Sequence, residues 1–372
     1  MKITTPTLLL DKEKCLRNIR RMVEKASENN VRLRPHFKTH QSVQVGEWFR
    51  DMGVKAITVS SVRMAAYFAR YGWNDILVAF PANVLEIAHI NQLASRIQLH
   101  LLAVNIETVD LLASLLQHPV NLWVKIDAGY RRTGILPNDH TTLDSILEKI
   151  KQSDKLHFQG FVVHDGHTYK QTDTEAIRTI HATSVYQLQL LRDRYKSQFP
   201  GLQLSIGDTP SCSIVEDLGG VNEIRPGNFV FYDLTQQRIG SCSFDEIAVC
   251  MACPVVAKHA DRSELILYGG SVHFSKDSLP SETGSVIYGR MVELNGKGWT
   301  QPVEGLELVS LSQEHSIVKA SPEQFAKYNI GDLMFVLPVH SCLTADLMRG
   351  YLTLEGERLE HLSGVGQLAV LL

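Results

Sequence analysis

The feature that most constrains the fold of this chain is an alternation of short apolar runs with amphipathic segments, between about residues 30 and 230. Eight β-branched runs are expected to form strands, which end near Lys38, Ser60, Phe80, Val104, Asp127, His164, Asp208 and Arg225. The segments between them, such as 62–71, 106–117 and 173–198, carry apolar residues at helical spacing. This pattern predicts an α/β fold, a (β/α)8 barrel of the TIM type, with an open doubly wound sheet as the alternative.

A second, mostly β domain is expected after the barrel. Beyond Leu234 the helical spacing gives way to short apolar runs separated by turn residues. The candidate strands there are 246–257, 264–268, 306–311, 334–339 and 367–371. We therefore assign residues 11–238 to the barrel and residues 239–372 to the β domain, together with residues 1–10. The run from Pro6 to Leu10 suits either domain.

Composition and charge exclude several classes of protein. The chain has 372 residues, a formal net charge of −3 and a sequence pI of about 6.6. No cluster of Lys or Arg favours nucleic acid or a membrane surface, and no apolar stretch reaches the roughly 18 residues of a membrane span. The N-terminus lacks the apolar core of a signal peptide, and the six cysteines are scattered. We expect a cytoplasmic protein with a small-molecule ligand.

Lys38 is the first candidate for chemistry. It ends a run that is too polar for an ordinary buried strand, at the end of the strand where barrel active sites lie. An amine that forms a Schiff base must be neutral part of the time, and nearby cations favour that form. Arg34, His36 and His40 are suitable neighbours. Taken by itself, the local sequence also suits a surface lysine.

Two segments after the seventh and eighth runs suit a phosphate group, which barrels often bind at these strands. Residues 207–211 combine a glycine with hydroxyl side chains, and Gly227 follows Arg225. Backbone N–H groups and hydroxyls at a strand end can hold an anion. Each segment alone is also compatible with an ordinary turn. The segment 164–169 adds two imidazoles and a phenol, which suit a ring platform or an acid–base group.

His340 and Cys342 are candidate metal ligands in the β domain. If this segment is a strand, residues two apart face the same side and can hold one ion together. An imidazole with a thiolate favours a borderline-soft ion such as zinc. A half-buried histidine beside a free cysteine is the alternative. By contrast, Cys250 and Cys253, inside an apolar run, are expected to be buried structural residues.

Taken together, these segments resemble the D-serine dehydratase and D-threonine aldolase family, whose members share the alanine racemase-like barrel of fold type III pyridoxal-phosphate (PLP) enzymes. The resemblance spans nearly the whole chain. The matching motifs are Pro6-Thr7, the segment 34–40, Asp127-Gly129-Arg132-Gly134, His164-Gly166-His167-Tyr169, Gly207-Thr209-Pro210-Ser211, Arg225-Pro226-Gly227-Asn228, Tyr232-Asp233 and His340-Cys342. The chain departs from the family's Ser-Glu-Glu-His-Gly pattern at Gln313 and Ser316, which concerns the substrate pocket.

The resemblance implies a role for each matching position. Lys38 is the expected Schiff-base lysine, and Arg132 is the expected neighbour of the cofactor's phenolic oxygen and of the substrate. His315, which keeps the family pattern, is expected among the catalytic residues. The expected cofactor contacts are His164, Tyr169, Gly207, Thr209, Gly227 and Asn228. His340 and Cys342 are the expected ligands of a divalent metal, zinc or manganese.

The resemblance also implies the reaction. We expect a lyase that dehydrates a D-3-hydroxy amino acid, as D-serine dehydratases do, to a 2-oxo acid and ammonia. The His-x-Cys pair favours this reaction over the first alternative, an aldolase that cleaves the Cα–Cβ bond to give glycine and an aldehyde. A racemase is disfavoured because it needs a second base and no metal. A non-catalytic PLP-binding protein is the alternative from another class, and a homodimer is the expected assembly.

Overall fold

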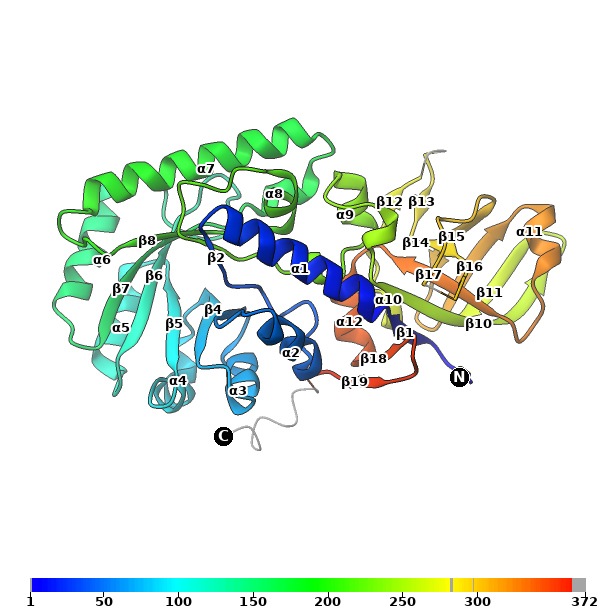
Figure 1. Cartoon of the computed structure of the whole chain (residues 1–372), viewed down its shortest axis with the longest axis horizontal. Helices are drawn as coiled ribbons and strands as arrows, with labels where there is room; N and C mark the ends of the chain where they lie inside the picture. The colour runs from blue at the N-terminus through cyan, green and yellow to red at the C-terminus, as the bar shows by residue number, and fades with distance from the viewer. Residues whose placement is uncertain (1, 282–283, 297, 363–372) are drawn as a thin grey trace. The chain divides into compact units, whose positions relative to one another are not determined.

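The computed structural model describes residues 2–281, 284–296 and 298–362, and the chain forms two compact units (Figure 1). The first, called the barrel unit, consists mainly of Arg20–Lys38 and Gly46–Gly227. The second, called the β unit, consists of Met1–Ile19, Thr39–Val45 and Asn228–His361. The two units therefore alternate along the first part of the chain, and the segment immediately after Lys38 belongs to the β unit.

The barrel unit contains a sheet of eight parallel strands, with the order β2-β9-β8-β7-β6-β5-β4-β3. The strands are β2 (Arg32–Leu33), β3 (Ile57–Val59), β4 (Asp75–Pro81), β5 (Gln98–Ala103), β6 (Val120–Lys125), β7 (Leu156–Val162), β8 (Gln203–Ile206) and β9 (Glu223–Ile224). A parallel bridge between His36 and Thr58 joins the continuation of β2 to β3, so the sheet closes on itself. The predicted (β/α)8 barrel is confirmed, with all eight expected strands.

Helices follow the strands and lie around the outside of the sheet (Figure 1). They are α2 (Val43–Asp51), α3 (Val62–Arg70), α4 (Ile87–Ala94), α5 (Ile106–Leu115), α6 (His140–Lys151), α7 (Thr174–Tyr195) and α8 (Thr209–Ile214), and α1 (Lys12–Glu28) precedes β2. Short polar side chains begin several of them, as expected for N-caps. Ser61 accepts from the Met64 N–H at 3.1 Å, and Asn105 accepts from the Thr108 N–H at 2.8 Å.

An apolar layer fills the barrel interior. Leu77, Leu102, Trp123 and Val162 are almost fully buried and pack against one another. They come from four consecutive strands of the sheet, β4 to β7. The barrel is therefore a packed core and not a pore, as is usual for this architecture. Leu102 and Val162 also form part of the floor of the cavity described below.

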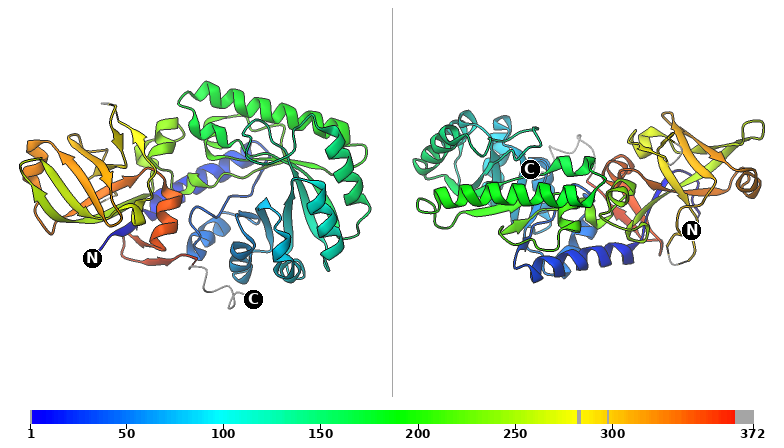
Figure 2. Two further views of the ribbon diagram at one scale, coloured as in Figure 1. Left: turned by 180° about the vertical axis from the view of Figure 1, so that it is seen from behind. Right: turned by 90° about the horizontal axis from the view of Figure 1, so that it is seen from above.

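The β unit is built on a nine-stranded sheet with the order β11-β16-β15-β14-β17-β10-β1-β18-β19. Figure 2 shows most of its strands, coloured yellow-green to orange, as a strongly twisted sheet. The strands are β1 (Thr7–Leu10), β10 (Val249–His259), β11 (Glu264–Tyr268), β14 (Gly289–Val292), β15 (Leu306–Leu311), β16 (His315–Ala320), β17 (Leu333–Pro338), β18 (Gly350–Thr353) and β19 (Arg358–Glu360). A separate hairpin contains β12 (Leu279–Pro280) and β13 (Val286–Ile287).

The mostly β second domain is thus confirmed. Four of the five strands expected there are present, and the fifth, 367–371, lies outside the described residues. The run from Pro6 to Leu10 contributes β1, which pairs with β10 and β18. The helices of this unit are short: α9 (Leu234–Ile239), α10 (Ser271–Phe274), α11 (Pro322–Lys327) and α12 (Ser341–Met348).

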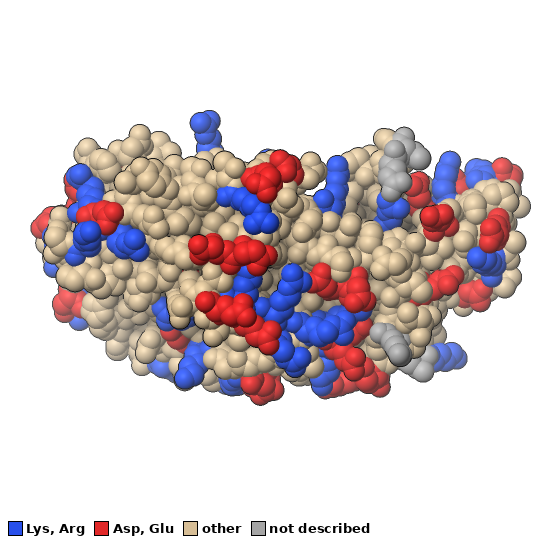
Figure 3. All heavy atoms as spheres, turned by 45° about the horizontal axis from the view of Figure 1, so that its top comes forward, with Lys and Arg blue, Asp and Glu red and all other residues tan. Residues whose placement is uncertain are grey.

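The structure bears on two expectations drawn from composition. Within the described ranges, no helix combines the length and the apolar character needed to cross a membrane. Acidic and basic side chains are interspersed over the molecular face drawn in Figure 3.

Cys250 and Cys253 are both fully buried in β10, and burial raises the pKa of each thiol well above its ordinary value. Both are therefore neutral thiols, which fits a structural role.

Candidate active site

A cavity of about 380 Å³ lies at the carboxyl ends of the barrel strands. Every one of the eight strands, or the loop that follows it, contributes to its lining: His36, Lys38, Ser60, Ala79, Phe80, Pro81, Leu102, Lys125, Arg132, Thr133, Val162, His164, Gly207 and Arg225. The sequence-predicted residues Lys38, Arg132, His164 and Gly207 are therefore brought together at one place. This is the end of a barrel at which enzymes of this architecture carry their active sites.

The cavity is electropositive. Lys38, Lys125, Arg132 and Arg225 all line it, and none of the described lining residues is acidic. Burial, together with the cationic neighbours Arg225 and Arg132, lowers the pKa of Lys125 to about 8. Burial likewise lowers the pKa of Arg225 to about 10. Each cation is thus poorly compensated by the protein, and an anionic ligand would supply the missing charge.

Hydrogen bonds to the barrel core fix the position of the Arg225 side chain. Its guanidinium donates to the Ser205 hydroxyl and to the Val163 carbonyl oxygen, both at 2.6 Å. Ser205 in turn donates to the buried carboxylate of Glu223 at 2.8 Å, and Glu223 also accepts from Arg34 at 2.7 Å. The barrel core therefore contains a connected polar network that ends at the cavity wall. Buried polar groups that are hydrogen-bonded to one another in this way make a local structure rigid.

The candidate phosphate segment lies after β8. The Thr209 N–H donates to the Tyr169 hydroxyl at 3.1 Å, which places two predicted cofactor contacts side by side. Within the described part of the chain, the buried hydroxyls of Thr209 and Ser211 have no hydrogen-bond partner. A buried hydroxyl without a partner is costly, so these two groups fit a bound anion such as the phosphate of PLP.

His164 is fixed by the same segment. Its Nδ1 lies 2.6 Å from the Gly207 carbonyl oxygen. Burial lowers the pKa of His164 well below its ordinary value, so the ring is neutral at physiological pH. Because a carbonyl oxygen only accepts, Nδ1 carries the hydrogen and Nε2 is left as an acceptor. The Tyr169 ring lies 6.4 Å from the His164 ring, centroid to centroid.

Tyr130 is a site residue that sequence reasoning missed. Its ring meets the His164 ring edge-on at 5.9 Å and stacks on His167 at 6.2 Å. The Arg132 guanidinium carbon lies over the Tyr130 ring, 5.0 Å from its centroid. Gly166 makes the arrangement possible, because a Cβ at this position would lie 2.4 Å from the Tyr130 ring. Tyr130 thus connects a cavity-lining cation with the histidine segment.

The candidate metal ligands lie in the β unit. The expectation that both belong to one strand is wrong, because β17 ends at Pro338, and His340 is instead the N-cap of α12. The two side chains are nevertheless close enough for Cys342 to raise the pKa of His340. The Thr39 hydroxyl lies 3.3 Å from the Cys342 sulfur, and the Asn228 amide donates to that sulfur at 3.4 Å.

The start of α12 is held by Asp233. Its buried carboxylate accepts from the Ser341 N–H at 3.0 Å and from the Asn228 amide at 2.7 Å. The side-chain nitrogen of Asn228 is therefore occupied in the β unit, whereas its Oδ1 is buried without a partner among the described residues. Gly227 and Asn228 are not among the residues that line the cavity. His315 is exposed at the beginning of β16.

The residues near His340 fit a catalytic metal. An imidazole and a thiol in contact form the donor set that zinc prefers. In the described ranges, no group of three or more His, Cys, Asp or Glu side chains is arranged to hold an ion. Two protein ligands leave positions for substrate and water, as a catalytic site requires. Burial by itself lowers the pKa of His340, but Asp277, Cys342 and Asp233 together raise it to about 11.

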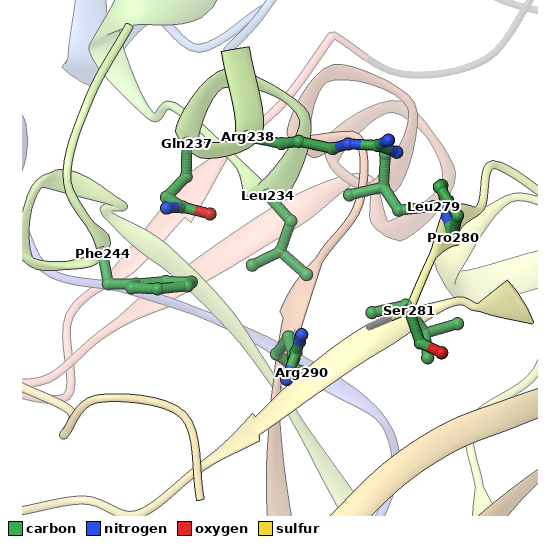
Figure 4. A pocket seen from close by; sticks show the side chains of 9 residues that line it. Leu234, Gln237, Arg238, Phe244, Leu279, Pro280, Ser281 and Arg290 are labelled. Carbon is green, nitrogen blue, oxygen red and sulfur yellow. The ribbon is translucent and has the colours of Figure 1, made fainter. Parts of the chain in front are cut away.

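The β unit also contains a second cavity of about 380 Å³ (Figure 4). In the close-up, Arg238 and Arg290 lie near the apolar side chains of Leu234, Phe244 and Leu279. None of the site residues expected from the sequence lines this cavity. The chemistry-bearing side chains therefore gather elsewhere, in the barrel cavity and around His340.

Two known families account for most of the chain. Residues 10–234 match the family described as "Alanine racemase, N-terminal domain", and residues 248–354 match the "Putative serine dehydratase domain". The closed parallel barrel, the antiparallel β unit and the cavity at the strand ends define an enzyme of the alanine racemase-like fold.

Relatives of known activity match over nearly the full length. D-serine dehydratase of Dictyostelium discoideum is 31% identical, with 94% of this chain and 93% of the relative covered. D-threo-3-hydroxyaspartate dehydratase of Delftia sp. HT23 is 27% identical, with 96% of each chain covered. A 3-hydroxy-D-aspartate aldolase of Paracoccus denitrificans is 24% identical, with 96% of this chain and 90% of the relative covered. The chain belongs to the D-serine dehydratase and D-threonine aldolase family, and it is a lyase.

Solved structures agree with this assignment. The Delftia dehydratase has a TM-score of 0.89 at 26% identity, and the match covers 98% of both chains. A cysteine-to-alanine mutant of the same enzyme, solved in the metal-free form, also has a TM-score of 0.89, at 27% identity and with 98% of each chain covered.

Proposed function

We propose that the protein is a PLP- and divalent-metal-dependent dehydratase of D-3-hydroxy amino acids, with D-serine as the representative substrate. The reaction would give a 2-oxo acid and ammonia. The observation that carries this proposal is the cationic cavity containing Lys38, in a chain that matches two dehydratases along almost its entire length. An amino-acid carboxylate and a cofactor phosphate are both anions, and this cavity suits them.

Lys38 is the proposed covalent anchor of PLP. The phosphate would accept from the unpartnered hydroxyls of Thr209 and Ser211 and from backbone N–H groups near Gly207 and Gly227. The neutral ring of His164 and the Tyr169 phenol would contact the pyridine ring. When bound, PLP supplies an electron sink that acidifies the Cα–H bond of an amino acid.

The chain's own residues would then handle the proton and the substrate. With PLP and the substrate bound, Lys38 would be the base that takes the proton from the substrate Cα. Arg132 would hold the phenolic oxygen and the substrate carboxylate. The cations Lys125 and Arg225 line the same cavity as Lys38 and would attract the anionic groups of the cofactor and the substrate.

His340 and Cys342 are the proposed metal ligands. A Lewis-acid metal, zinc for this donor set with manganese as the second candidate, stabilises the developing charge on the β-hydroxyl as it leaves. The segment after Lys38 is relevant to this site, since Thr39 contacts the Cys342 sulfur. The Thr39 hydroxyl and the Asn228 amide both lie within hydrogen-bond distance of this sulfur, which fixes its position.

Product analysis tests the proposal. The metal-loaded enzyme is incubated with D-serine and with D-threonine, with and without a chelator, and the products are identified. Dehydration predicts ammonia with pyruvate from D-serine and ammonia with 2-oxobutanoate from D-threonine, and both reactions stop when the metal is removed. Glycine with acetaldehyde from D-threonine, and no 2-oxo acid, would establish the aldolase instead. That reaction is the second candidate because an aldolase is among the full-length relatives.

We also propose a homodimer, as the family resemblance implies, and a cytoplasmic location, as expected from the sequence. Light scattering on the purified, cofactor-loaded protein measures the mass of the assembly. A mass of one chain, about 41.7 kDa, would contradict the dimer.

A further inference from the structure

Asp277 contacts a candidate metal ligand directly. One of its carboxylate oxygens lies 2.8 Å from Nδ1 of His340. Both side chains are partly exposed, at 42% and 40% of their surface. The two residues are 63 positions apart, four of the nine strands of the β unit's sheet lie between them in the sequence, and nothing in the sequence pattern links the two positions. The pair is therefore a product of the fold.

The geometry leaves one ring nitrogen of His340 for a metal. The carboxylate accepts a hydrogen bond from Nδ1, so Nδ1 carries a hydrogen and is not available as a ligand. Nε2 is then the only ring nitrogen that can bind an ion. A histidine whose second nitrogen donates to a carboxylate is fixed in tautomer and orientation, and it becomes a more basic ligand.

The backbone around Asp277 is built to hold this contact. Ser275 has a φ of +70°, a conformation that residues other than glycine rarely adopt. Its hydroxyl donates to the carboxylate of Asp277 at 3.2 Å and accepts from the Asp277 N–H at 3.2 Å. The preceding helix, α10, is tied to α12 because Thr344 donates to the Phe274 carbonyl oxygen at 3.2 Å. The segment that carries Asp277 is therefore fixed to the helix that begins beside His340.

We infer that Asp277 is a positioning residue of the metal site: it sets the tautomer and orientation of His340 without binding the ion itself. This inference rests on the proposed function, in that His340 and Cys342 must bind a metal. It adds a residue that determines how tightly the ion is held. Loss of a carboxylate partner of this kind typically weakens metal binding 10- to 100-fold.

Metal affinity, measured without reference to turnover, provides the test. The full-length, PLP-loaded protein is stripped of metal and titrated with Zn²⁺ against a chromophoric chelator. We expect Asp277→Ala to weaken Zn²⁺ binding by about 10- to 100-fold. Asp277→Asn keeps an oxygen acceptor for Nδ1 but not the charge, so its affinity is expected to lie between those of Asp277→Ala and the wild type. The melting temperature of the metal-free proteins shows whether the variants fold.

Asp346→Asn is the matched control. Asp346 lies on α12 and is also 42% exposed, but it contacts Gln41 and Arg349. If Asp277 acts by orienting His340, Asp346→Asn leaves Zn²⁺ affinity nearly unchanged. If Asp346→Asn lost as much Zn²⁺ affinity as Asp277→Asn, only the local negative charge would matter, and the inference would be overturned. Unchanged affinity in both Asp277 variants would overturn it as well.

Cobalt distinguishes a positioning residue from a ligand. Co²⁺-loaded wild type and Asp277→Ala, both saturated with the ion, are compared by visible absorption. Because the same ligands remain when only orientation is affected, the positions and intensities of the d–d bands should stay nearly the same. A marked change in these bands would mean that Asp277 is itself a ligand. If wild type binds no ion, or His340→Ala binds as well as wild type, the metal assignment of the proposed function fails, and this inference fails with it.

Discussion

The Nδ1 atom of His164 lies 2.6 Å from the carbonyl oxygen of Gly207, and this contact joins the ends of β7 and β8 inside the barrel unit. It determines which nitrogen of the ring carries the hydrogen. The ring is buried, and burial lowers the pKa of His164 well below its ordinary value. His164 therefore presents Nε2 as an acceptor, and it does so over the whole physiological pH range.

We expect His164 to remain neutral, with the hydrogen on Nδ1, between pH 5 and pH 8. Proton-detected nitrogen spectra of protein labelled at histidine report the tautomer, and the His164→Gln variant identifies the signal. A signal from this residue that moves to the imidazolium position as the pH falls from 8 to 5 would contradict the assignment.

The cavity contains two amines, so the identity of the cofactor-binding lysine can be tested directly. Lys38→Ala should lose the visible absorbance of lysine-bound PLP, because no amine remains at that position. Lys125 is the matched control. It lines the same cavity, and burial lowers its pKa to about 8, so it is itself a reasonable nucleophile. Lys125→Met should keep the band. Borohydride reduction followed by peptide mass spectrometry should find the cofactor on Lys38, and its recovery on Lys125 would reverse the assignment.

A pair of buried acids makes stability depend on pH. Burial and the neighbouring Asp208 raise the pKa of Asp165 well above its ordinary value. Each carboxyl has one oxygen that is buried without a partner among the described residues, so the pair must hold a proton to avoid two uncompensated charges. The folded chain then binds this proton more tightly than the unfolded chain. Its contribution to stability is complete below about pH 4 and is lost as the pH rises through the raised pKa.

Asp165→Asn removes this titration but keeps an oxygen that can accept from Ser184, which donates to Asp165 at 2.8 Å in the wild type. The free energy of unfolding in urea should therefore fall less between pH 5 and pH 8.5 in Asp165→Asn than in the wild type. Each unit by which the pKa of Asp165 is raised corresponds to about 1.4 kcal/mol of the free energy of unfolding that is lost at high pH. The same pH dependence in both proteins would mean that the pair does not hold an extra proton.

The unpartnered hydroxyl of Thr209 gives a prediction for the phosphate site. Thr209→Val keeps the side-chain shape but removes the donor. A hydrogen bond to a charged group contributes about 1.5–3 kcal/mol, so the dissociation constant for PLP should rise about tenfold or more. It is measured by titrating the cofactor-free protein. Thr179→Ala, on the exposed side of α7, is the control and should bind PLP as the wild type does. Equal affinity in all three proteins would remove Thr209 from the phosphate site.

The sequence predicted the barrel well because its signal is local. Each of the eight runs has its own apolar, β-branched composition, and the polar residue that ends it lies at the mouth in the closed sheet. Lys38, His164 and Gly207 were predicted for this reason, Arg132 was predicted from the family resemblance, and all four line the cavity. The change at the end of β17 was not predicted, because Val339-His340-Ser341 suits a strand as well as a helix start. The polar contacts of Asp233 decide between them.

Other site residues had no sequence signal at all. Tyr130 contacts His164 and His167 only because the loop after β6 folds over the segment after β7. Asp277 reaches His340 only through the packing of α10 against α12. Lys125 did have a signal, as a charged residue at the end of a strand, but that position alone does not distinguish a site residue from a structural one. Such contacts depend on tertiary structure, which spacing along the chain does not encode.

The contact between Gly166 and Tyr130 gives a prediction that isolates the aromatic group. A Cβ on Gly166 would lie 2.4 Å from the Tyr130 ring, closer than any real contact, so Gly166→Ala must displace the ring. Overpacking of this kind typically costs about 1–3 kcal/mol. The displaced ring would also leave Arg132, which lies 5.0 Å from its centroid, without its support. Gly166→Ala should therefore lower the melting temperature and raise KM for the D-amino acid, because Arg132 is the proposed substrate contact.

A double-mutant cycle separates this cause from a general effect of alanine on the backbone. Gly166 does not have a positive φ, so alanine is not strained there by conformation alone. In Tyr130→Ala the ring is absent, and adding Gly166→Ala should then cost little further stability. We expect a coupling energy of about 1 kcal/mol or more between the two positions, as is typical of residues in direct contact. Additive losses would mean that Gly166 is required for another reason, and that Tyr130 does not depend on it.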